Sequence, residues 1–398
     1  MRRLFPLRRF ALQAAFFLFA ATAAPLAAEP VLVIPFFSRS PDANVDWISE
    51  SVAHTIQDAL ESRGILVLDR NERETVYRRL SIRPNALLTR ATIMKVAEEM
   101  DASAVIWGEF ELTPAEGTRG TLRVSATTLD MKRLRQGRPV EESGPLEELA
   151  AVQSRLAWRI LRRFAPDDTP EQEAFLRERP SVRLDAMENY TRGLMASEID
   201  QKRRFIIQAA RLEPGFSEAR YELGRLYCDE KQYEQAAGWL KGIQKDAPRY
   251  LEAMFLLGLC RYEEGDFPGA QQAFEMVAEA VPLNEVFNNL GAAQSRRDLP
   301  QALNSFETAL DGDATDPDYH FNVGYALLKQ GRFEEAAERL RAVLERDPED
   351  GDAADMLKLA TARKRPSAGD AGLERLKLNF EERAYRQLKS AIEALKRK

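Results

Sequence analysis

The chain has 398 residues, of which 44% are hydrophobic and 30% are charged, and its net charge at neutral pH is −6. This length predicts two or three domains, and the acidic balance argues against a general nucleic-acid binder, which usually carries a strong basic excess. The chain has only two histidines and two cysteines and no CxxC or HExxH spacing, so a His/Cys metal cluster is not expected. We expect neither a metal nor a cofactor.

Residues 1–28 have the layout of a secretory signal peptide. The first ten residues, "MRRLFPLRRF", carry four arginines and no acid; the apolar run "ALQAAFFLFAATAA" follows, and small residues precede Glu29. We expect cleavage after Ala28 and a bacterial protein that is periplasmic or secreted. The alternative is an uncleaved inner-membrane anchor over residues 10–28, since this stretch is close to the ~20 residues that span a bilayer.

Between residues 29 and 164, apolar runs typical of strands alternate with segments whose apolar residues have the spacing of a helix. "PVLVIPFF" is typical of a buried strand. "GTLRVSATTLDM" alternates apolar and polar residues, like a strand with one solvent-exposed face. The first amphipathic helix ends at Gly64, a common helix stop. The expected strands are 30–37, 65–69, 103–112 and 120–131, and the expected helices are 44–64, 72–80, 90–100 and 144–164.

The order of these elements, with "IPFF", "DWISESVAHTIQDAL", "GILVLDR" and "AEEMDASAVIWGEFE" leading into "LRVSATTLDM", resembles the amino-terminal domain of TolB and the related FlgO-like and cyclase-associated domains of bacterial envelope proteins. The resemblance covers 29–164. It implies an α+β domain, a mixed sheet with packed helices, that recognises and assembles with other proteins and has no known chemistry. Unlike TolB, this chain has no six-bladed propeller after the domain.

A proline-rich, charged segment at 165–181 predicts an inter-domain linker. Beyond it, small residues recur with a period near 34, which is typical of a repeat protein. The recurring residues are Gly224, Gly258, Gly291 and Gly324; Ala236, Ala270, Ala302 and Ala336; and Pro248, Pro282, Pro317 and Pro348. This pattern resembles the tetratricopeptide repeat, in which two antiparallel helices cross closely.

The small residues have a physical reason. Gly in the first helix and Ala in the second let the two backbones approach, although Gly in a helix costs up to ~1 kcal/mol, and stacking of the repeats buries a shared core. We expect an all-α superhelix over 182–364. Its repeats are expected near 186–214 (incomplete), 217–250, 251–283, 284–316 and 317–350, with a capping helix at 350–363.

In tetratricopeptide arrays the first helix of each repeat lines the concave face. Aromatic residues are favoured binding anchors, so this resemblance implies a groove for a protein or peptide partner. The alternative is that some of these aromatic rings simply pack between neighbouring first helices. The expected groove residues are Tyr221, Arg225, Phe255, Leu259, Tyr262, Asn288, Arg296, Phe321, Tyr325 and Lys329.

The last segment predicts an amphipathic helix over 371–397, separated from the cap by "RPSAGDAG". It has three alternative roles: to fold back as a cap on the array, to bind a partner, or to lie on a membrane surface. The mixed sign of its polar face weakens the membrane alternative. The apolar stripe of this helix comprises Leu373, Leu376, Phe380, Leu388, Ile392 and Leu395.

No motif nominates a catalytic residue, because GxSxG, P-loop and dinucleotide-binding patterns are absent. His54 and His320 are better explained as structural or surface residues. Cys228 and Cys260 lie in adjacent repeats, where a disulfide would need Cα atoms within about 7 Å.

We therefore predict an exported non-enzymatic scaffold or adaptor. The alternatives are an envelope enzyme or a small-ligand sensor with an unrecognised site in the αβ domain.

Overall fold

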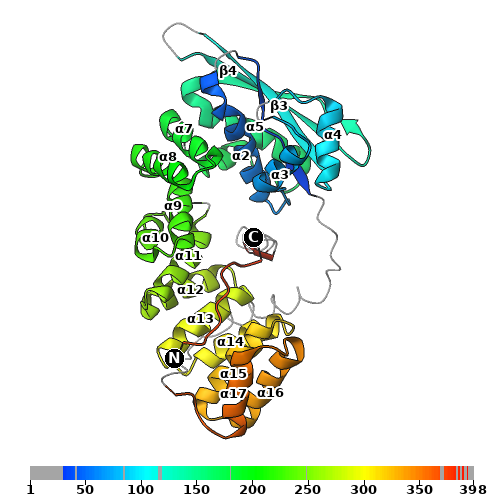
Figure 1. Cartoon of the computed structure of the whole chain (residues 1–398). Coiled ribbons are helices and arrows are strands. Elements are labelled where there is room, and N and C mark those ends of the chain that lie inside the picture. Colours follow the sequence, from blue (N-terminus) through cyan, green and yellow to red (C-terminus); the bar gives the residue numbers. More distant parts are fainter. Residues whose placement is uncertain are drawn as a thin grey trace, which may run out of the picture.

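The computed structural model consists of a sheet domain that leads into a curved array of paired helices (Figure 1). This confirms the expected fold class. The expected signal peptide, or anchor, lies outside the described residues. Within the described part of the chain, no helix is long and apolar enough to cross a membrane. The described residues are 30–40, 43–83, 86–114, 119–179, 181–247, 249–367, 372–381, 384–385, 388–389 and 392.

The sheet of the amino-terminal domain is mixed. Strands β1 and β2 both pair in parallel with β3, which runs antiparallel to β4, and β4 pairs antiparallel with β5 and β6. The long β3–β4 pair forms the centre of the sheet, so it positions the helices on both faces. The bounds are β1 Val31–Val33, β2 Phe37–Ser38, β3 Ala104–Thr113, β4 Thr121–Asp130, β5 Arg135–Gln136 and β6 Val140–Pro145.

Helices cover both faces of this sheet. Val31 and Val33 face a core shared with α2 and α5, whereas Leu32 and Ile34 face a second core shared with α3 and α4. This alternation follows from the period of two in a strand. The bounds are η1 Ala43–Val45, α2 Trp47–Glu61, α3 Arg70–Arg79, α4 Arg90–Glu99, η2 Leu146–Glu148 and α5 Leu149–Phe164.

Several details of this domain differ from the expectation. The segment 65–69 makes a single parallel bridge, between Val31 and Val67, instead of a strand. Strand β6 was not expected, because its sequence "VEESGP" is charged and ends in residues typical of turns. Its polar side chains are tolerated because β6 pairs with β4 alone among the described strands, and the helix expected from residue 144 begins at Leu149.

The segment expected as a linker, 165–181, contains a short helix, α6 (Gln172–Arg177). Phe175 of this helix is fully buried in the core that α2 and α5 share. Trp158 also donates a hydrogen bond to the carbonyl of Pro170 at 2.9 Å. The segment therefore packs on the sheet domain and is not a separate linker between two domains.

Five consecutive helix pairs and a final single helix follow. The repeat expected to be incomplete, near 186–214, is a helix pair with a short turn. The helices are α7 Leu184–Met195, α8 Ile199–Leu212, α9 Ser217–Asp229, α10 Tyr233–Leu240, α11 Tyr250–Glu263, α12 Phe267–Ala280, α13 Asn284–Arg296, α14 Ala302–Gly312, α15 Pro317–Gln330, α16 Phe333–Arg346 and α17 Gly351–Thr361.

The repeated glycines lie where the two helices of a pair touch. A Cβ atom on Gly291 would lie 2.6 Å from the ring of Phe306, and one on Gly258 would lie 2.6 Å from Phe274. Real Cβ contacts are longer, so a large side chain from the second helix occupies the space that a first-helix side chain would need. This is the close approach that the spacing of small residues predicts.

The sheet domain docks directly on the first half of the array. His54 of α2 meets Tyr190 of α7 edge-on, with ring centroids 5.7 Å apart. Asp58 pairs with His54 at 3.2 Å and with Arg249, the residue before α11, at 3.5 Å. Burial alone would lower the pKa of His54, but the charge of Asp58 and its hydrogen bond outweigh burial and raise this pKa to about 9.

We expect Gly291→Ala to lower the free energy of unfolding by about 1–3 kcal/mol, the usual cost of overpacking a core. Gly238 is the matched control, since it is a helical glycine at which an added Cβ atom would have nothing within 4 Å. Gly238→Ala should raise the free energy of unfolding by up to ~1 kcal/mol through helix propensity. Urea unfolding followed by circular dichroism measures both, and equal effects of the two substitutions would contradict the packing argument.

The junction between the sheet domain and the array is expected to weaken in alkali. Because the folded pKa of His54 is raised to about 9, its contribution is complete below the unfolded value of ~6.5 and is lost as the pH rises through 9. His54 and Asp58 side chains are 27% and 31% exposed, so solvent screening limits the effect to ~1 kcal/mol. His54→Ala should flatten the decline in unfolding free energy between pH 6.5 and 9.5.

His320→Ala serves as the control for this pH dependence, since burial lowers the pKa of His320 and places its titration at lower pH. The alkaline decline should therefore persist in that variant. A decline of the same size in the His54 variant would show that another group causes it.

Candidate functional site

The concave face of the array holds the carboxy-terminal segment of the same chain (Figure 1). Residues 372–381 contain no helix, so the helix expected over 371–397 is wrong for this stretch. Helical backbone is described only from Ala384 on, and the amide of Tyr385 donates to the carbonyl of Glu381 at 2.9 Å. We call residues 372–385 the tail.

Two asparagines bind the backbone of the tail. The side chain of Asn322 (α15) donates to the carbonyl of Arg375 and accepts from its amide, both at 2.8 Å. Asn289 (α13) makes the same pair of bonds with Lys377, again both at 2.8 Å. An amide side chain carries one donor group and one acceptor, which match the N–H and C=O of a single residue. The array thus forms hydrogen bonds to the backbone of alternate residues of an extended chain.

A third asparagine completes this network. Asn288 donates to the carbonyl of Arg375 at 2.7 Å, and its own carbonyl accepts from Asn322 at 2.7 Å. Asn288, Asn289 and Asn322 are all fully buried. A buried amide without partners costs roughly 1–3 kcal/mol, so a segment that covers these asparagines must supply hydrogen bonds in place of water, as the tail does.

These bonds explain why the tail is extended. In a helix the amides and carbonyls of residues 375 and 377 would bond within the segment, and they would not be free for the asparagines. In the extended form they reach Asn322 and Asn289, which lie on neighbouring first helices. Contacts with distant residues therefore outweigh the helical periodicity of the tail itself.

The side chain of Glu374 enters a polar subsite. Its carboxylate accepts from the hydroxyl of Ser295 at 2.7 Å and lies 3.5 Å from the hydroxyl of Tyr262. Burial raises the pKa of Tyr262, and the nearby charge of Glu374 raises it further. The ammonium of Lys329 donates to the carbonyl of Ser295 at 2.8 Å and to its hydroxyl at 3.3 Å. This arrangement favours an acidic side chain at this place.

The next charged residue of the tail, Arg375, meets an aromatic ring and two carboxylates. Its guanidinium carbon lies 3.8 Å from the ring centroid of Phe321. The same group pairs with Asp318 at 3.4 Å and with Asp350 at 2.7 Å. Arginine is well suited to such a site because its planar cation both stacks on rings and pairs with carboxylates.

Lys377 lies between Asp316 and Asp318, with its ammonium 2.7 Å from each carboxylate. Burial would lower the pKa of Lys377, but hydrogen bonds to Asp316 and Asp318 and their charges outweigh burial and raise it. Asp318 therefore contacts both Arg375 and Lys377. This end of the groove selects positive charge.

An aromatic cluster holds the far part of the tail. The ring of Phe380 packs edge-on against Phe255 with centroids 5.1 Å apart, and it touches the ring of Tyr385 at 4.6 Å. Tyr385 is buried, and its hydroxyl donates to Glu252 at 2.8 Å. Because Phe255 and Glu252 belong to α11, the tail extends from the cap to the third helix pair.

The structure brings several of the expected groove residues together around the tail. Phe255, Tyr262, Asn288 and Phe321 contact it directly, and Lys329 acts through Ser295. Tyr325 stacks on Phe321 with centroids 6.3 Å apart, and Leu259 is buried in the core. The guanidinium of Arg296 lies beside Gly372.

Tyr221 and Arg225 lie apart from this cluster, on α9. Arg249 stacks on Tyr221 at 5.3 Å, and Arg225 pairs with Glu222 at 2.9 Å. The expected set omits residues that bind the tail: Asn289, Asn322, Asp316 and Asp350. A signal for the first two was present, because both are asparagines at the same place in successive repeats.

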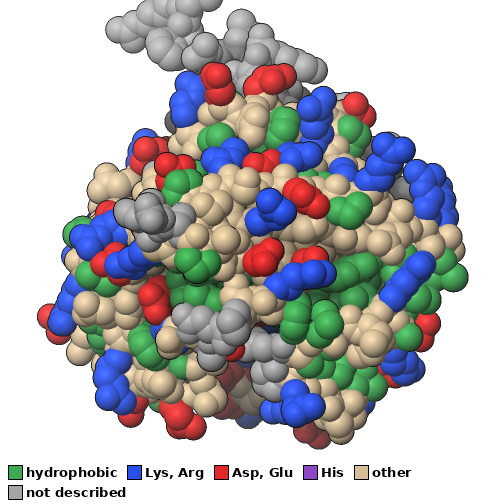
Figure 2. All heavy atoms as spheres, turned by 90° about the horizontal axis from the view of Figure 1, so that it is seen from above, with side chains coloured by type: hydrophobic (Ala, Val, Ile, Leu, Met, Phe, Trp, Pro, Cys, Tyr) green, Lys and Arg blue, Asp and Glu red, His purple; other side chains and the backbone are tan. Residues whose placement is uncertain are grey.

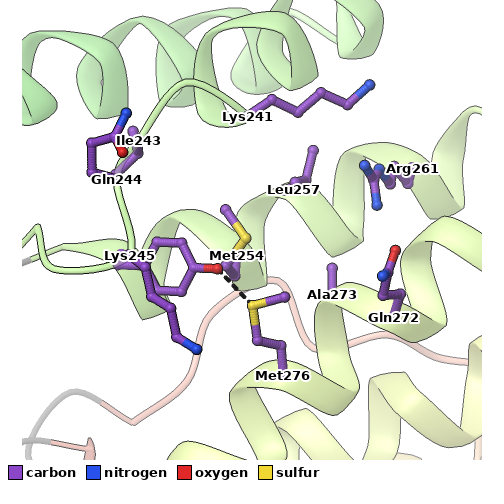
Figure 3. A pocket seen from close by; sticks show the side chains of 11 residues that line it. Lys241, Ile243, Gln244, Lys245, Met254, Leu257, Arg261, Gln272, Ala273 and Met276 are labelled. Atoms are coloured by element: carbon purple, nitrogen blue, oxygen red, sulfur yellow. Dashed lines mark hydrogen bonds between the residues drawn. The ribbon is translucent and has the colours of Figure 1, made fainter. Parts of the chain in front are cut away.

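A separate pocket of about 320 Å³ opens between the end of α10 and helices α11 and α12 (Figure 3). Tyr250 and Met276 meet across it, with the hydroxyl 2.7 Å from the sulfur. Lys241, Lys245 and Arg261 lie around it, and no His, Cys, Asp or Glu is among the described residues that line it.

Other buried polar groups are structural. In the sheet domain, Arg73 pairs with Glu50 at 2.7 Å and donates to the carbonyl of Val33 at 3.0 Å. Burial would raise the pKa of Glu50, but the charges of Arg73 and Arg70 outweigh burial and lower it.

Cys228 and Cys260 are free thiols. The described residues contain no group of three His, Cys, Asp or Glu that could hold a metal.

The outer surface of the sheet domain shows no patch of one charge on the face in Figure 2. Lysine and arginine side chains are interspersed there with acidic and hydrophobic ones. A nucleic-acid interface would gather basic residues on one face, so this face does not support one.

Tetratricopeptide-repeat family models match residues 252–284 and 292–351, so the chain contains tetratricopeptide repeats. No curated protein matches the chain. Similar solved structures include MamA from Desulfovibrio magneticus RS-1, 20% identical over 42% of this chain and 95% of its own, with a TM-score of 0.38.

Two further solved structures match at similar levels. YrrB, described as a TPR protein with an unusual peptide-binding site, is 18% identical over 47% of this chain and 91% of its own, with a TM-score of 0.36. PilF from Pseudomonas aeruginosa is 18% identical over 45% and 84%, with a TM-score of 0.38. At these values the similarities carry no argument about function.

We expect Asn322→Ala to loosen the tail. The change removes two bonds to the backbone of Arg375, each worth about 1 kcal/mol, so tryptic cleavage after Arg375 or Lys377 should accelerate by at least ~10-fold. Limited proteolysis with mass spectrometry measures this rate. The matched control is Asn304→Ala, an exposed position on the second helix α14, which should leave the rate unchanged. Equal rates in both variants would contradict the clamp.

Proposed function

We propose that this protein is an exported, non-enzymatic adaptor of the bacterial envelope. Its repeat array holds an extended segment of one partner, and its αβ domain docks to a second component. The observation that carries the proposal is the pair of asparagine clamps, Asn289 and Asn322, which bind alternate backbone residues of an extended chain. A groove that already fits one such chain is equipped to hold another.

Two kinds of contact support peptide binding in this groove. The asparagines contact backbone atoms, which every peptide offers, so they supply affinity without strict sequence preference. The subsites for Glu374, Arg375 and Lys377 supply selectivity, as side-chain pockets do in other modes of peptide recognition. Tetratricopeptide repeats also bind peptide or protein partners in general, which agrees with this assignment.

The envelope location and the docking role of the αβ domain rest on the sequence. The layout of residues 1–28 favours export, and residues 29–164 resemble envelope assembly domains. The buried packing of Phe175 and the contacts of His54 and Asp58 support a design in which both modules act as one body. A partner on the sheet domain would then sit at a fixed distance from the groove.

A non-enzymatic role is supported by the chemistry of the buried groups. Arg73 and Glu50 pair with each other, and the described residues that line the pocket near Tyr250 include no carboxylate, histidine or thiol. Neither place pairs a serine or cysteine nucleophile with a histidine or carboxylate base, an arrangement that many hydrolases use.

Photo-crosslinking in cells tests this function. A photoreactive amino acid at Arg225, an exposed first-helix position, should form a defined adduct with another envelope protein. The control is Glu338 on the outer helix α16, also exposed, which should give no such adduct. Mass spectrometry identifies the crosslinked protein. Purified protein that captures no partner at Arg225 but hydrolyses cell-wall glycan would overturn the proposal.

A further inference from the structure

We infer that the tail is a built-in ligand that closes the groove, and that the partner is an extended segment with the same chemistry. That segment would carry an acidic residue, a basic residue, an apolar residue, a second basic residue and, three positions later, an aromatic one; the apolar position is that of Leu376, which packs against the core of the array. In the tail these are Glu374, Arg375, Leu376, Lys377 and Phe380. The inference rests on the proposed function and adds the class of partner and the way access is controlled.

Each defined position of this pattern has a subsite in the array. Glu374 meets Ser295 at 2.7 Å, and Arg375 lies on Phe321 at 3.8 Å. The positions left open have weak contacts: Leu378 is 70% exposed, and Asn379 is also exposed. The groove therefore distinguishes the defined positions from the open ones.

Charge makes the pattern selective. Asp316, Asp318 and Asp350 all pair with basic side chains of the tail. If the tail left without a replacement, these carboxylates would repel one another, and the buried asparagines would lose their partners. An occupant with two cations, spaced like Arg375 and Lys377, restores both sets of contacts. An acidic segment would be rejected.

The connection to the cap indicates that the tail belongs to the same molecule. After α17, Arg363 pairs with Glu334 of α16, and Arg365 donates to the carbonyl of Gln330 in α15 at 3.3 Å. The chain is thus held against the array on its way back to the groove. A ligand tethered this closely has an effective concentration in the millimolar range.

This tether predicts the strength of the closure. A free segment that binds an open groove with a dissociation constant of ~10 µM would compete with a tail at ~1 mM, so its apparent affinity would fall by about 100-fold. Partners then need a second contact or a high local concentration to enter.

The test uses the full chain and a fluorescent synthetic peptide of residues 371–389. The charge reversals Arg375→Glu and Lys377→Glu, made together in the protein, should release the tail and open the groove. Fluorescence anisotropy should then show the peptide binding at least ~100-fold more tightly than to the unaltered chain. The control variant, Arg341→Glu with Lys358→Glu, makes the same change of charge on α16 and α17 outside the groove and should bind like the unaltered chain.

Two more variants make the outcome decisive. Adding Asn289→Ala and Asn322→Ala to the opened protein should abolish peptide binding, whereas adding Asn304→Ala should not. A peptide with both basic residues replaced by glutamate should not bind any variant. Equal affinity of the peptide for the opened and the unaltered chain would overturn the inference. So would a full-length dimer that becomes monomeric in the opened variant, because the tail would then occupy a second copy.

Failure of this inference and failure of the proposed function are distinguishable. If the peptide does not bind the opened groove but crosslinking at Arg225 still captures a partner, the inference is wrong and the adaptor role stands. If the peptide binds the opened groove as expected but no partner is captured in cells, the closure stands and the adaptor role is wrong.

Discussion

The contact between two helix backbones within each repeat is the constraint on which the rest of the array depends. Gly258 and Gly291 lie directly against the rings of Phe274 and Phe306, so each second helix is locked to one side of its first helix. The other side of the first helices α11, α13 and α15 then contacts the tail. Because of this regularity, Asn289 and Asn322 point at alternate residues of one extended chain.

The groove is a polar surface that needs an occupant. Three buried asparagines and three carboxylates lie along it, and all six bond to the backbone or the cations of the tail or to each other. An extended backbone with two cations satisfies these groups at once, because its amides and carbonyls are free and its side chains alternate. The selectivity of the site therefore follows from the placement of these polar and charged groups, with aromatic rings such as Phe321 and Phe255 adding contact area.

The repeats were predictable from the sequence because Gly, Ala and Pro spacing reflects contacts within one short unit. The strand β6 was not, because its charged sequence is accommodated by pairing with β4 alone. The tail was predicted as a helix because Leu373, Leu376 and Phe380 have helical spacing, yet its conformation depends on Asn322 and Asn289, far away in the chain. Aromatic groove residues were predicted by position, but periodicity within a segment cannot show which distant side chains will take its backbone bonds.

The path of the tail has a mechanical consequence for the array. A stack of repeats is held together mainly by contacts between neighbours, so it bends easily along its length. The tail contacts α11 through Phe380, α13 and α15 through the asparagine clamps, and the start of the cap through Asp350. It thus ties three repeats and the cap into a longitudinal brace. If a partner segment replaced the tail, the bending stiffness of the superhelix would change, and so would the distance between the two ends of the array.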